Sequence, residues 1–179
     1  DNAKTQLNRF IIENYLNNYF YDRDEPFKDG TSFLSAAINL GNISIRNLFL
    51  ISQRNSFFKK NTSKIESIKT WQNEIIWREF YQHSLFHFPN LAKGPLKKKW
   101  SSFPWEDNEV FLKRLENGLT GFPIVDASIR QLKESGWMHN RCRMIVASFL
   151  VKDLICNWQF GEIFFMKHLV DGDLASNNG

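Results

Sequence analysis

The feature that most constrains the fold is a polar segment that runs directly into an apolar one. Residues 136–144 carry a histidine, an asparagine and two arginines, and residues 145–151 are apolar except for Ser148. Such an apolar run predicts a buried helix. Asn140 and Met144 are four residues apart, so a helix places them on one face. Because arginines at the mouth of a core helix are costly without a polar or anionic partner, the segment is predicted to bind a ligand.

The remainder of the chain shows the periodicity of helices and not that of strands. Further helices are predicted over residues 1–20, 33–40, 44–51, 68–86, 109–116, 123–132 and 162–169. No alternating strand pattern, GxGxxG motif or P-loop occurs. Residues 55–67 are predicted to be an exposed connection, and residues 171–179 a polar loop that holds a ligand. The predicted fold is therefore all-α, a globular assembly of several helices.

Charge and cysteine content narrow the classes of protein. The formal net charge is +4 and the pI is about 9.1, which suits a polyanionic partner. Cys142 and Cys156 lie in helical stretches without metal-ligand spacing, which favours a reducing compartment. The first residues do not form a signal peptide, and no apolar run reaches the roughly 20 residues that span a membrane. His83 and His87 are spaced like metal ligands, but no acidic residue completes a zinc motif, so no metal site is predicted.

Two short stretches have both a structural and a functional interpretation. The hydroxyls of Thr31 and Ser32 either cap the helix predicted to follow them or, with its free backbone N–H groups, bind an anion. On the helix predicted over residues 68–86, Glu74 either forms an ion pair with Arg78 beside core aromatics or points with Trp77 into a pocket.

A third stretch, residues 93–100, is a loop with four lysines that ends in Trp100. Lysines can neutralise phosphates without reading a base sequence, so the loop is a candidate contact for a polyanion. The alternative is a solvated surface loop.

Four long motifs resemble, in their order, those of the DNA photolyase/cryptochrome family. They are Trp71–Tyr81, Thr120–Ala127, Gly136–Met144 and Asp171–Gly179. The chain resembles the helical FAD-binding domain of that family over nearly its whole length, and within it the class I, bacterial-type cyclobutane pyrimidine dimer photolyases. The resemblance implies that residues 1–179 are part of the catalytic domain and that the sequence is truncated at both ends. The N-terminal α/β antenna domain and the end of the catalytic domain would then be missing.

The resemblance implies a light-driven repair enzyme. Reduced, light-excited FAD would pass an electron to a cyclobutane pyrimidine dimer flipped out of UV-damaged DNA, the ring would split, and the electron would return. An antenna chromophore, folate or deazaflavin, is expected on the missing N-terminal domain. The protein is expected to be a cytoplasmic monomer.

The resemblance also assigns residues to the flavin. They are Tyr19, Thr31, Ser32, Leu34, Ser35, Asn140, Arg143, Asp171, Asp173 and Asn177. For Thr31 and Ser32 it favours phosphate binding over a plain helix cap. Arg143 would pair with Asp171 beside the flavin. Asn177 would face the reactive nitrogen of the flavin, where plant cryptochromes carry an acid and animal ones a cysteine, so it favours repair.

Another set is assigned to the dimer and to DNA. The catalytic residues are expected to be Glu74, Trp77, Asn140, Met144 and Asn177. Trp77 would stack on the flipped bases, an interaction worth roughly 1–3 kcal/mol per base, and Glu74 and Asn140 would hydrogen-bond the edges of the dimer. The DNA-binding residues are expected to be Trp77, Arg141, Lys97 and Lys98, with the lysines on backbone phosphates.

Trp105 and Trp158 align with two members of the tryptophan chain through which the family reduces its flavin in light. A packed aromatic is the alternative for each, and the third member would lie beyond Gly179.

Two other functions remain open from the sequence. One is a cryptochrome-type blue-light receptor, which binds FAD and repairs nothing, and the other is a non-enzymatic basic DNA-binding module, which would be colourless. Repair of the (6-4) photoproduct is a smaller possibility, because that branch places histidines in the pocket and only His139 is near.

Overall fold

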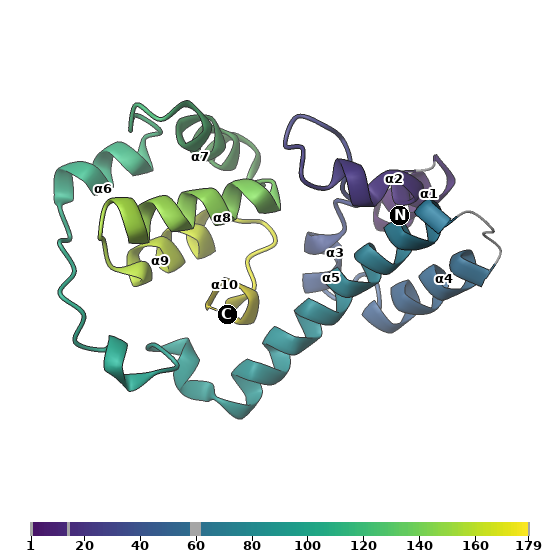
Figure 1. Ribbon diagram of the computed structural model, residues 1–179, viewed down its shortest axis with the longest axis horizontal. Helices are drawn as coiled ribbons and strands as arrows, with labels where there is room; N and C mark the ends of the chain where they lie inside the picture. The colour runs from purple at the N-terminus through teal and green to yellow at the C-terminus, as the bar shows by residue number, and fades with distance from the viewer. Residues whose placement is uncertain (1, 14, 58–61, 179) are drawn as a thin grey trace. The chain divides into compact units, whose positions relative to one another are not determined.

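A computed structural model of the protein describes residues 2–13, 15–57 and 62–178. The described residues contain α-helices, two short 3₁₀ helices (η1 and η2) and one π-helix (η3), and they contain no β-strand, so the predicted all-α fold is confirmed. The helices are α1 (Asn2–Ile12), α2 (Tyr15–Asp22), α3 (Ser35–Asn39), α4 (Ile45–Phe57), α5 (Thr62–His87), η1 (Pro89–Ala92), η2 (Lys98–Trp100), α6 (Glu109–Glu116), α7 (Pro123–Ser135), α8 (Asn140–Ser148), η3 (Phe149–Asp153), α9 (Trp158–His168) and α10 (Leu174–Asn178) (Figure 1). No helix within the described ranges is long and apolar enough to cross a membrane.

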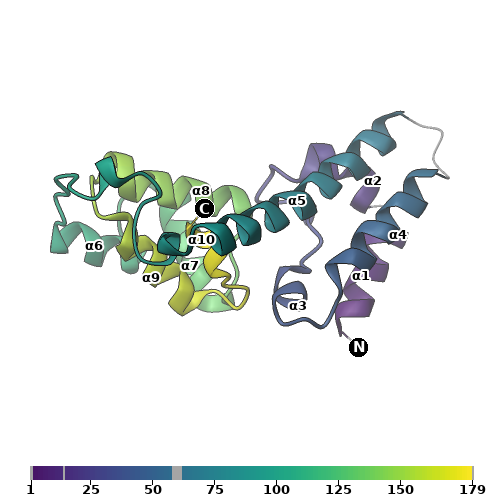
Figure 2. The same cartoon turned by 90° about the horizontal axis from the view of Figure 1, so that it is seen from below.

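The chain divides into two compact units, Asp1–His83 and Ser84–Gly179. In the first unit, α1 packs against α2, and the Phe10 ring of α1 lies 5.2 Å from the Trp71 ring of α5, measured between centroids. The side chain of Gln72 on α5 donates to the Ser52 hydroxyl at 2.9 Å, so α4 lies beside α5 (Figure 2). The core of this unit consists of Phe10, Leu16, Tyr19, Leu34, Leu48, Ile68, Trp71 and Ile75.

The second unit is built around α8. This helix packs against α7 and continues into η3, which in turn contacts α9. Val146, Phe149 and Leu150 are buried, so the buried helix predicted from the apolar run is confirmed, with a π-helical end. The core consists of Leu115, Val125, Ile129, Leu132, Met138, Cys142, Val146, Phe149, Leu150, Cys156, Phe164 and Phe165. Both cysteines are free thiols within it.

Several predicted helix boundaries in the first unit were wrong. In place of the one helix predicted over residues 1–20, the described residues of that range contain α1 and the first part of α2. The helix predicted to begin at residue 33 begins at Ser35, because Phe33 has a φ of 53°, a left-handed conformation that no α-helix can include. Thr31 and Ser32 therefore do not cap it. Residues 62–67, predicted to be part of an exposed connection, are the first turns of α5, and residues 58–61 of that connection lie outside the described residues.

Two boundaries in the second unit also differ. Helix α9 begins at Trp158, four residues earlier than predicted, because the Asn157 side chain accepts a hydrogen bond from the backbone N–H of Gln159 at 3.0 Å and caps it. The tail predicted to be a polar loop contains the short helix α10. Gly179, the last residue of that predicted loop, lies outside the described residues.

Candidate flavin and lesion site

The residues assigned to the site are divided between the two units, and each group is described within its own unit. The first unit carries Tyr19, Thr31, Ser32, Leu34, Ser35, Glu74 and Trp77. The second carries Lys97, Lys98, Trp105, Asn140, Arg141, Arg143, Met144, Trp158, Asp171, Asp173 and Asn177.

The segment that contains Thr31 and Ser32 packs closely against α2 at one end and against the core of the first unit at the other. A Cβ atom on Gly30 would lie 2.6 Å from the Cβ of Asp22, so only glycine allows the chain to pass α2 at this distance. Leu34, on the other side, has no exposed surface and belongs to the core. The backbone between these two points is therefore fixed, although Ser35 itself is exposed.

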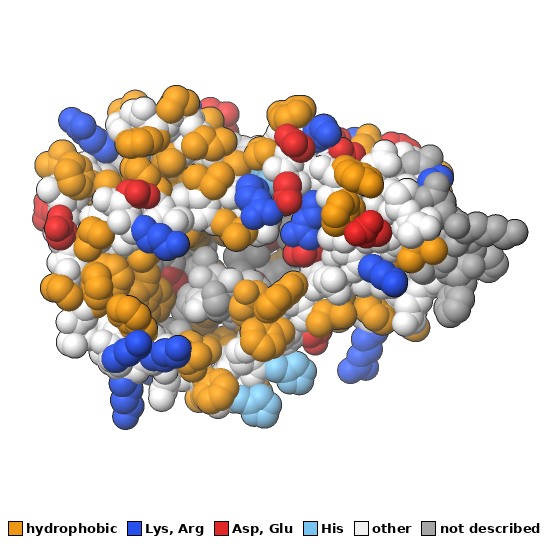
Figure 3. Space-filling view, viewed as in Figure 1, with side chains coloured by type: hydrophobic (Ala, Val, Ile, Leu, Met, Phe, Trp, Pro, Cys, Tyr) orange, Lys and Arg blue, Asp and Glu red, His pale blue; other side chains and the backbone are white. Residues whose placement is uncertain are grey.

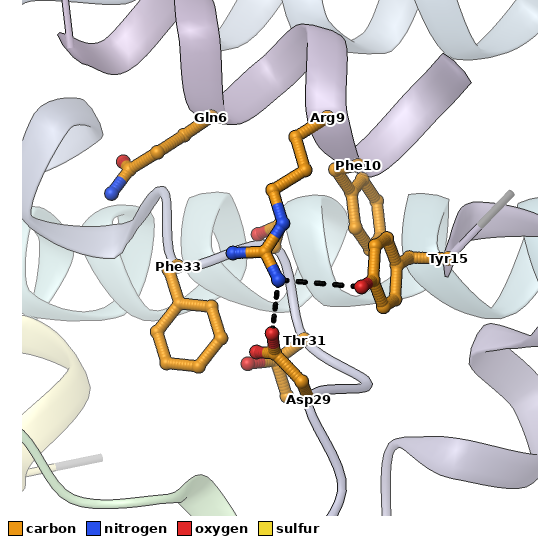
Figure 4. A pocket seen from close by; sticks show the side chains of 8 residues that line it. Gln6, Arg9, Phe10, Tyr15, Asp29, Thr31 and Phe33 are labelled. Atoms are coloured by element: carbon orange, nitrogen blue, oxygen red, sulfur yellow. Dashed lines mark hydrogen bonds and ion pairs between the residues drawn. The ribbon is translucent and has the colours of Figure 1, made fainter. Parts of the chain in front are cut away.

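A pocket of about 280 Å³ opens beside this segment (Figure 4). It is lined by Gln6, Arg9, Phe10, Tyr15, Asp29, Thr31, Ser32 and Phe33. One guanidinium nitrogen of Arg9 donates both to the Tyr15 hydroxyl, at 3.3 Å, and to the carboxylate of Asp29. The hydroxyl oxygen of Thr31 is buried and has no hydrogen-bond partner among the described residues. A buried hydroxyl of this kind needs a partner, and a polar ligand in the pocket could supply one.

Arg23 joins Tyr19 and Glu74 within the first unit. Its guanidinium donates to a carboxylate oxygen of Glu74 at 2.5 Å, and its central carbon lies 5.5 Å from the centroid of the Tyr19 ring. Arg78, the expected partner of Glu74, instead donates to Glu79 at 3.1 Å, so the interpretation as a Glu74–Arg78 ion pair was wrong. Sequence reasoning missed Arg23, because it lies 51 residues from Glu74 and no local pattern relates the two positions.

The electrostatics of this cluster keep both of its hydrogen-bond donors protonated. Burial raises the pKa of the Tyr19 hydroxyl well above its ordinary range, and the nearby carboxylate of Glu74 raises it further. Burial opposes the charge of Arg23, but Tyr19 and the hydrogen bond to Glu74 outweigh it, so the pKa of Arg23 is raised. Glu74 is thus held beside a permanent cation.

Trp77 presents an indole to solvent one turn beyond Glu74 on α5. The residue is 52% exposed. Its ring stacks on that of Tyr81, with the centroids 5.9 Å apart and an interplanar angle of 27°, and meets the ring of Phe80 nearly edge-on. An exposed indole braced by two aromatic rings is suited to stacking on a flat ligand.

The start of α8 forms the centre of the site in the second unit. His139 is buried and caps the helix, because its Nδ1 accepts a hydrogen bond from the backbone N–H of Arg141 at 3.1 Å. The backbone N–H of Val170 donates to the carbonyl of Gly136 at 2.9 Å. Gly136 has a φ of 69°, and a Cβ there would lie 2.6 Å from a methyl of Val170, so glycine allows the segment before Asp171 to approach α8.

This approach brings Asp171 to Arg143. The guanidinium of Arg143 donates to one carboxylate oxygen of Asp171 at 2.8 Å and to the carbonyl of Met138 at 2.8 Å. The side chain of Asp171 is only 2% exposed, and its other oxygen, Oδ1, is buried with no hydrogen-bond partner among the described residues. A buried carboxylate oxygen without a donor is costly, so this atom marks a place where a ligand could donate.

Asn140 and Met144 lie on one face of α8, as their spacing predicts. The Asn140 side-chain amide is 4.0 Å from the sulfur of Met144, and a guanidinium nitrogen of Arg141 is 3.7 Å from the same sulfur. Asn140 is exposed and Met144 is 53% exposed. These side chains therefore form an exposed surface of polar groups and one thioether at the N-terminal end of α8.

The short helix α10 begins directly after Asp173 and contains Asn177. One carboxylate oxygen of Asp173 accepts hydrogen bonds from the backbone N–H and the hydroxyl of Ser176, at 3.2 and 2.6 Å. The Asn177 amide nitrogen donates to the carbonyl of Glu162 at 3.1 Å, which ties α10 to α9. Both side chains are therefore fixed in direction.

Trp105 and Trp158 belong to segments that are hydrogen-bonded to each other. The backbone N–H of Glu106 donates to the carbonyl of Ile155 at 2.9 Å, and that of Asn157 donates to the carboxylate of Asp107 at 2.8 Å. Each tryptophan is next in sequence to one of these bonds, so the second unit holds the two segments that carry them together. Both are partly buried.

Lys97 and Lys98 lie at the start of η2 and are exposed. In the part of the chain that the structure describes, no group of three or more histidine, cysteine or acidic side chains could hold a metal ion.

A sequence profile described as the FAD binding domain of DNA photolyase matches residues 71–179. The chain belongs to the DNA photolyase family. A deoxyribodipyrimidine photo-lyase of Synechococcus sp. is 53% identical over 161 residues, which cover 90% of this chain and 33% of the relative. Among solved structures, a class III photolyase from Agrobacterium tumefaciens is 43% identical, with a TM-score of 0.90 over 98% of this chain and 36% of that one.

A cryptochrome of Synechocystis sp. has the same TM-score, 0.90, at 31% identity, over 99% of this chain and 36% of that one. Similarity of fold therefore does not separate photolyases from cryptochromes within the family, whereas the two photolyases named above are more similar in sequence, at 53% and 43% identity, than this cryptochrome. The chain spans about a third of the length of the relatives that it matches.

Proposed function

We propose that residues 1–179 are part of the helical catalytic domain of a photolyase that splits cyclobutane pyrimidine dimers in UV-damaged DNA under light. The observation that carries the proposal is the pairing of Arg143 with the buried Asp171, whose other carboxylate oxygen has no partner among the described residues, in a chain that is 53% identical to a deoxyribodipyrimidine photo-lyase.

The described residues fit FAD as the cofactor. Asp171 Oδ1 could accept from a flavin N–H group, and the Thr31 hydroxyl could donate to a phosphate, which would satisfy two buried atoms that have no partner among the described residues. Tyr19, Asp173 and Asn177 would contact the flavin, and Ser32, Leu34 and Ser35 would hold the phosphates together with Thr31. When bound, reduced and excited by light, FAD would supply the electron that opens the cyclobutane ring.

The side chains assigned to the lesion would bind it without chemistry of their own. Trp77 would stack on the flipped bases. Glu74, held by Arg23, and Asn140 would hydrogen-bond the polar edges of the dimer, and Met144 would supply a polarizable contact. Arg141 would pair with a phosphate of the damaged strand.

Two further parts of the proposal concern light. Trp105 and Trp158 would carry electrons to the oxidised flavin, because the second unit holds their segments together. A folate or deazaflavin antenna would belong to a domain outside this chain.

A cryptochrome-type photoreceptor is the second candidate, because a cryptochrome matches the chain over 99% of its length with a TM-score as high as that of a photolyase. It would share the flavin site and leave the dimer intact.

Repair of a thymine-dimer oligonucleotide tests the proposal. The full-length protein with chemically reduced FAD is expected to remove dimers in blue light and not in darkness. Trp77→Ala and Glu74→Gln should each lower the yield about tenfold or more, in proportion to a lost stacking or charged hydrogen-bond interaction. Ile76→Ala, an exposed neighbour on α5, is the matched control. Bound flavin without repair would assign the protein to the photoreceptors, and absence of bound flavin would refute the cofactor site.

A further inference from the structure

Within the second unit, positive charge is concentrated in one segment, residues 84–105, which we call the lysine segment. It contains Lys93, Lys97, Lys98 and Lys99 and no acidic residue, so its formal charge is +4. All four lysines are exposed. Figure 3 shows blue side chains gathered at the lower left, over the segment that joins α5 to α6 in Figure 1. A concentration of one sign of charge raises the local concentration of an oppositely charged partner.

Aromatic side chains are exposed among these lysines. Phe86 is 79% exposed, Phe88 55% and Trp100 49%. The ammonium nitrogen of Lys99 lies 5.0 Å from the centroid of the Trp100 ring. Lysines interleaved with exposed aromatic rings are the combination with which proteins hold single-stranded nucleic acids, because the lysines neutralise phosphates and the rings stack on bases.

The lysine segment also surrounds a hollow of about 420 Å³, which is large enough for a nucleotide. It is lined by His87, Phe88, Pro89, Asn90, Leu91, Lys93, Gly94, Pro95, Leu96, Lys98 and Ser101. Two lysines, Lys93 and Lys98, therefore line an open, partly apolar hollow beside Phe88, where a base could lie next to its phosphate.

The backbone around the hollow is fixed by bonds to the rest of the second unit. The Gln159 side chain of α9 donates to the carbonyl of Lys93 at 3.2 Å, and the Asn178 side chain of α10 donates to that of Leu91 at 3.0 Å. The 3₁₀ helices η1 and η2 order the chain on either side. Because the backbone is already ordered, binding of a ligand would not incur the entropy cost of ordering this backbone.

We propose that the lysine segment is a binding site for single-stranded DNA, with Lys97, Lys98 and Lys99 on phosphates and Trp100 stacked on a base. The choice of DNA over RNA, and the expectation that Lys97 and Lys98 contact phosphates, rest on the proposed function. The proposal adds Lys99, the stacking of Trp100 and the hollow, and it needs neither flavin nor a dimer. Duplex DNA fits less well, since its bases expose no faces to Trp100. An acidic peptide would match the lysines and leave the aromatic rings without a role.

Binding of undamaged, fluorescein-labelled oligothymidine of about 16 nucleotides, a length in the range of known site sizes, tests the phosphate contacts. The full-length, flavin-loaded protein is titrated in darkness over a range of salt concentrations. Neutralising Lys97, Lys98 and Lys99 together to glutamine should reduce the slope of log K against log salt by about 2, at roughly 0.7 per phosphate on a single strand, and weaken binding about tenfold or more at low salt. The control neutralises three exposed lysines of the same unit, Lys113, Lys152 and Lys167, and should leave the slope within error of the wild type.

Trp100→Ala tests the stacking. It should weaken binding of the oligothymidine about fivefold or more without changing the salt slope, whereas Trp100→Phe should retain most of the affinity. Affinity for a duplex of the same length should change less. The same effects are expected in a Trp77→Ala background, which separates this site from the lesion pocket.

An unchanged salt slope in the triple lysine variant would overturn the proposal, and so would equal effects of Trp100→Ala on single-stranded and duplex DNA. These outcomes are distinguishable from failure of the proposed function. The binding assay needs no repair, and a protein that repairs dimers with normal yield could still lack this site.

Discussion

Asp171 and Arg143 form a pair in which one carboxylate oxygen is hydrogen-bonded and the other is buried without a partner among the described residues. Removing the charge of Asp171 would leave a partly buried guanidinium without its counter-ion. Breaking a fully buried pair typically costs 3–5 kcal/mol, and since the Arg143 side chain is 25% exposed we expect Asp171→Asn to lower the free energy of unfolding by about 1–3 kcal/mol. Urea unfolding of the flavin-free protein measures this.

Asp153→Asn, an exposed change of the same kind in the second unit, is the control and should shift the urea midpoint little. If the variant Asp171→Asn is as stable as the wild type, the stabilisation from the ion pair is cancelled by the cost of burying the unpartnered oxygen. In that case Asp171 would be retained for binding alone.

Arg9 and Asp29 belong to the residue scale as well, since their ion pair holds the chain two residues before Thr31 (Figure 4). If Thr31 and Ser32 hold the FAD phosphates, loosening this pair should weaken FAD binding. Exposed pairs contribute little, so Arg9→Gln and Asp29→Asn are each expected to raise the dissociation constant for FAD about two- to fivefold. Binding of riboflavin, which has no phosphates, should be unchanged.

Exchanging the two charges separates positioning from direct phosphate binding. The double variant Arg9→Asp/Asp29→Arg should recover most of the FAD affinity if the pair acts by fixing the segment. If Arg9 instead contacts a phosphate itself, Asp29→Asn should strengthen FAD binding, and the exchanged variant should remain weak.

At the scale of elements, one carboxylate stabilises the turn that precedes α7. Asp126 accepts hydrogen bonds from the backbone N–H and the hydroxyl of Thr120, at 2.7 and 2.6 Å, and from the backbone N–H of Gly121 at 3.0 Å. Burial alone would raise the pKa of Asp126, but the bonds from Thr120 and Gly121 outweigh it and lower the pKa below its ordinary value of 3.8. The stabilisation is therefore present above about pH 4, where the unfolded carboxyl is ionised, and is lost as the pH falls through the lower, folded pKa.

We accordingly expect Asp126→Asn to lower the free energy of unfolding by about 1–3 kcal/mol at neutral pH, and the difference from the wild type to shrink below about pH 4. Urea unfolding at pH 7 and pH 3 measures both. A difference that stays constant between the two pH values would show that the charge of Asp126 contributes nothing.

Elements with local signals at both ends were predicted well from the sequence. Helix α6 has the predicted bounds, with Asn108 accepting from the backbone N–H of Val110 at 3.0 Å as its cap. Helix α7 begins at Pro123, as predicted, and ends at the left-handed Gly136. Where a boundary depends on an unusual conformation, as at Phe33, composition gives no signal, and the prediction was wrong. The Arg23–Glu74 pair was missed for a related reason, because it joins positions that only tertiary packing brings together.

At the scale of the whole molecule, most of the site was indicated by motifs and not by periodicity. Residues assigned to one cofactor come from both compact units, and no local pattern relates Thr31 to Asp171. The resemblance supplied that relation. The structure adds what the motifs could not, namely which buried atoms, Thr31 Oγ1 and Asp171 Oδ1, lack partners within the described residues.

The proposed electron path also belongs to this scale, because it would join a cofactor to the protein surface. The hydrogen bonds of Glu106 and Asn157 hold the segments of Trp105 and Trp158 together. We expect Trp158→Phe to slow light-driven reduction of the oxidised flavin at least tenfold, since phenylalanine is far harder to oxidise than tryptophan. Repair by protein whose flavin is reduced chemically should be unchanged. Absorbance of the flavin under blue light, with an external thiol as electron donor, follows the reduction.

Trp100→Phe is the matched control, because Trp100 is a half-exposed tryptophan of the same unit outside the proposed path. It should photoreduce at the wild-type rate. Equal slowing by both variants would point to a general loss of flavin or of folding, which the bound-flavin content would reveal. If instead Trp158→Phe photoreduces normally with full flavin content, electrons reach the flavin by another route, and Trp158 is a packing residue of α9.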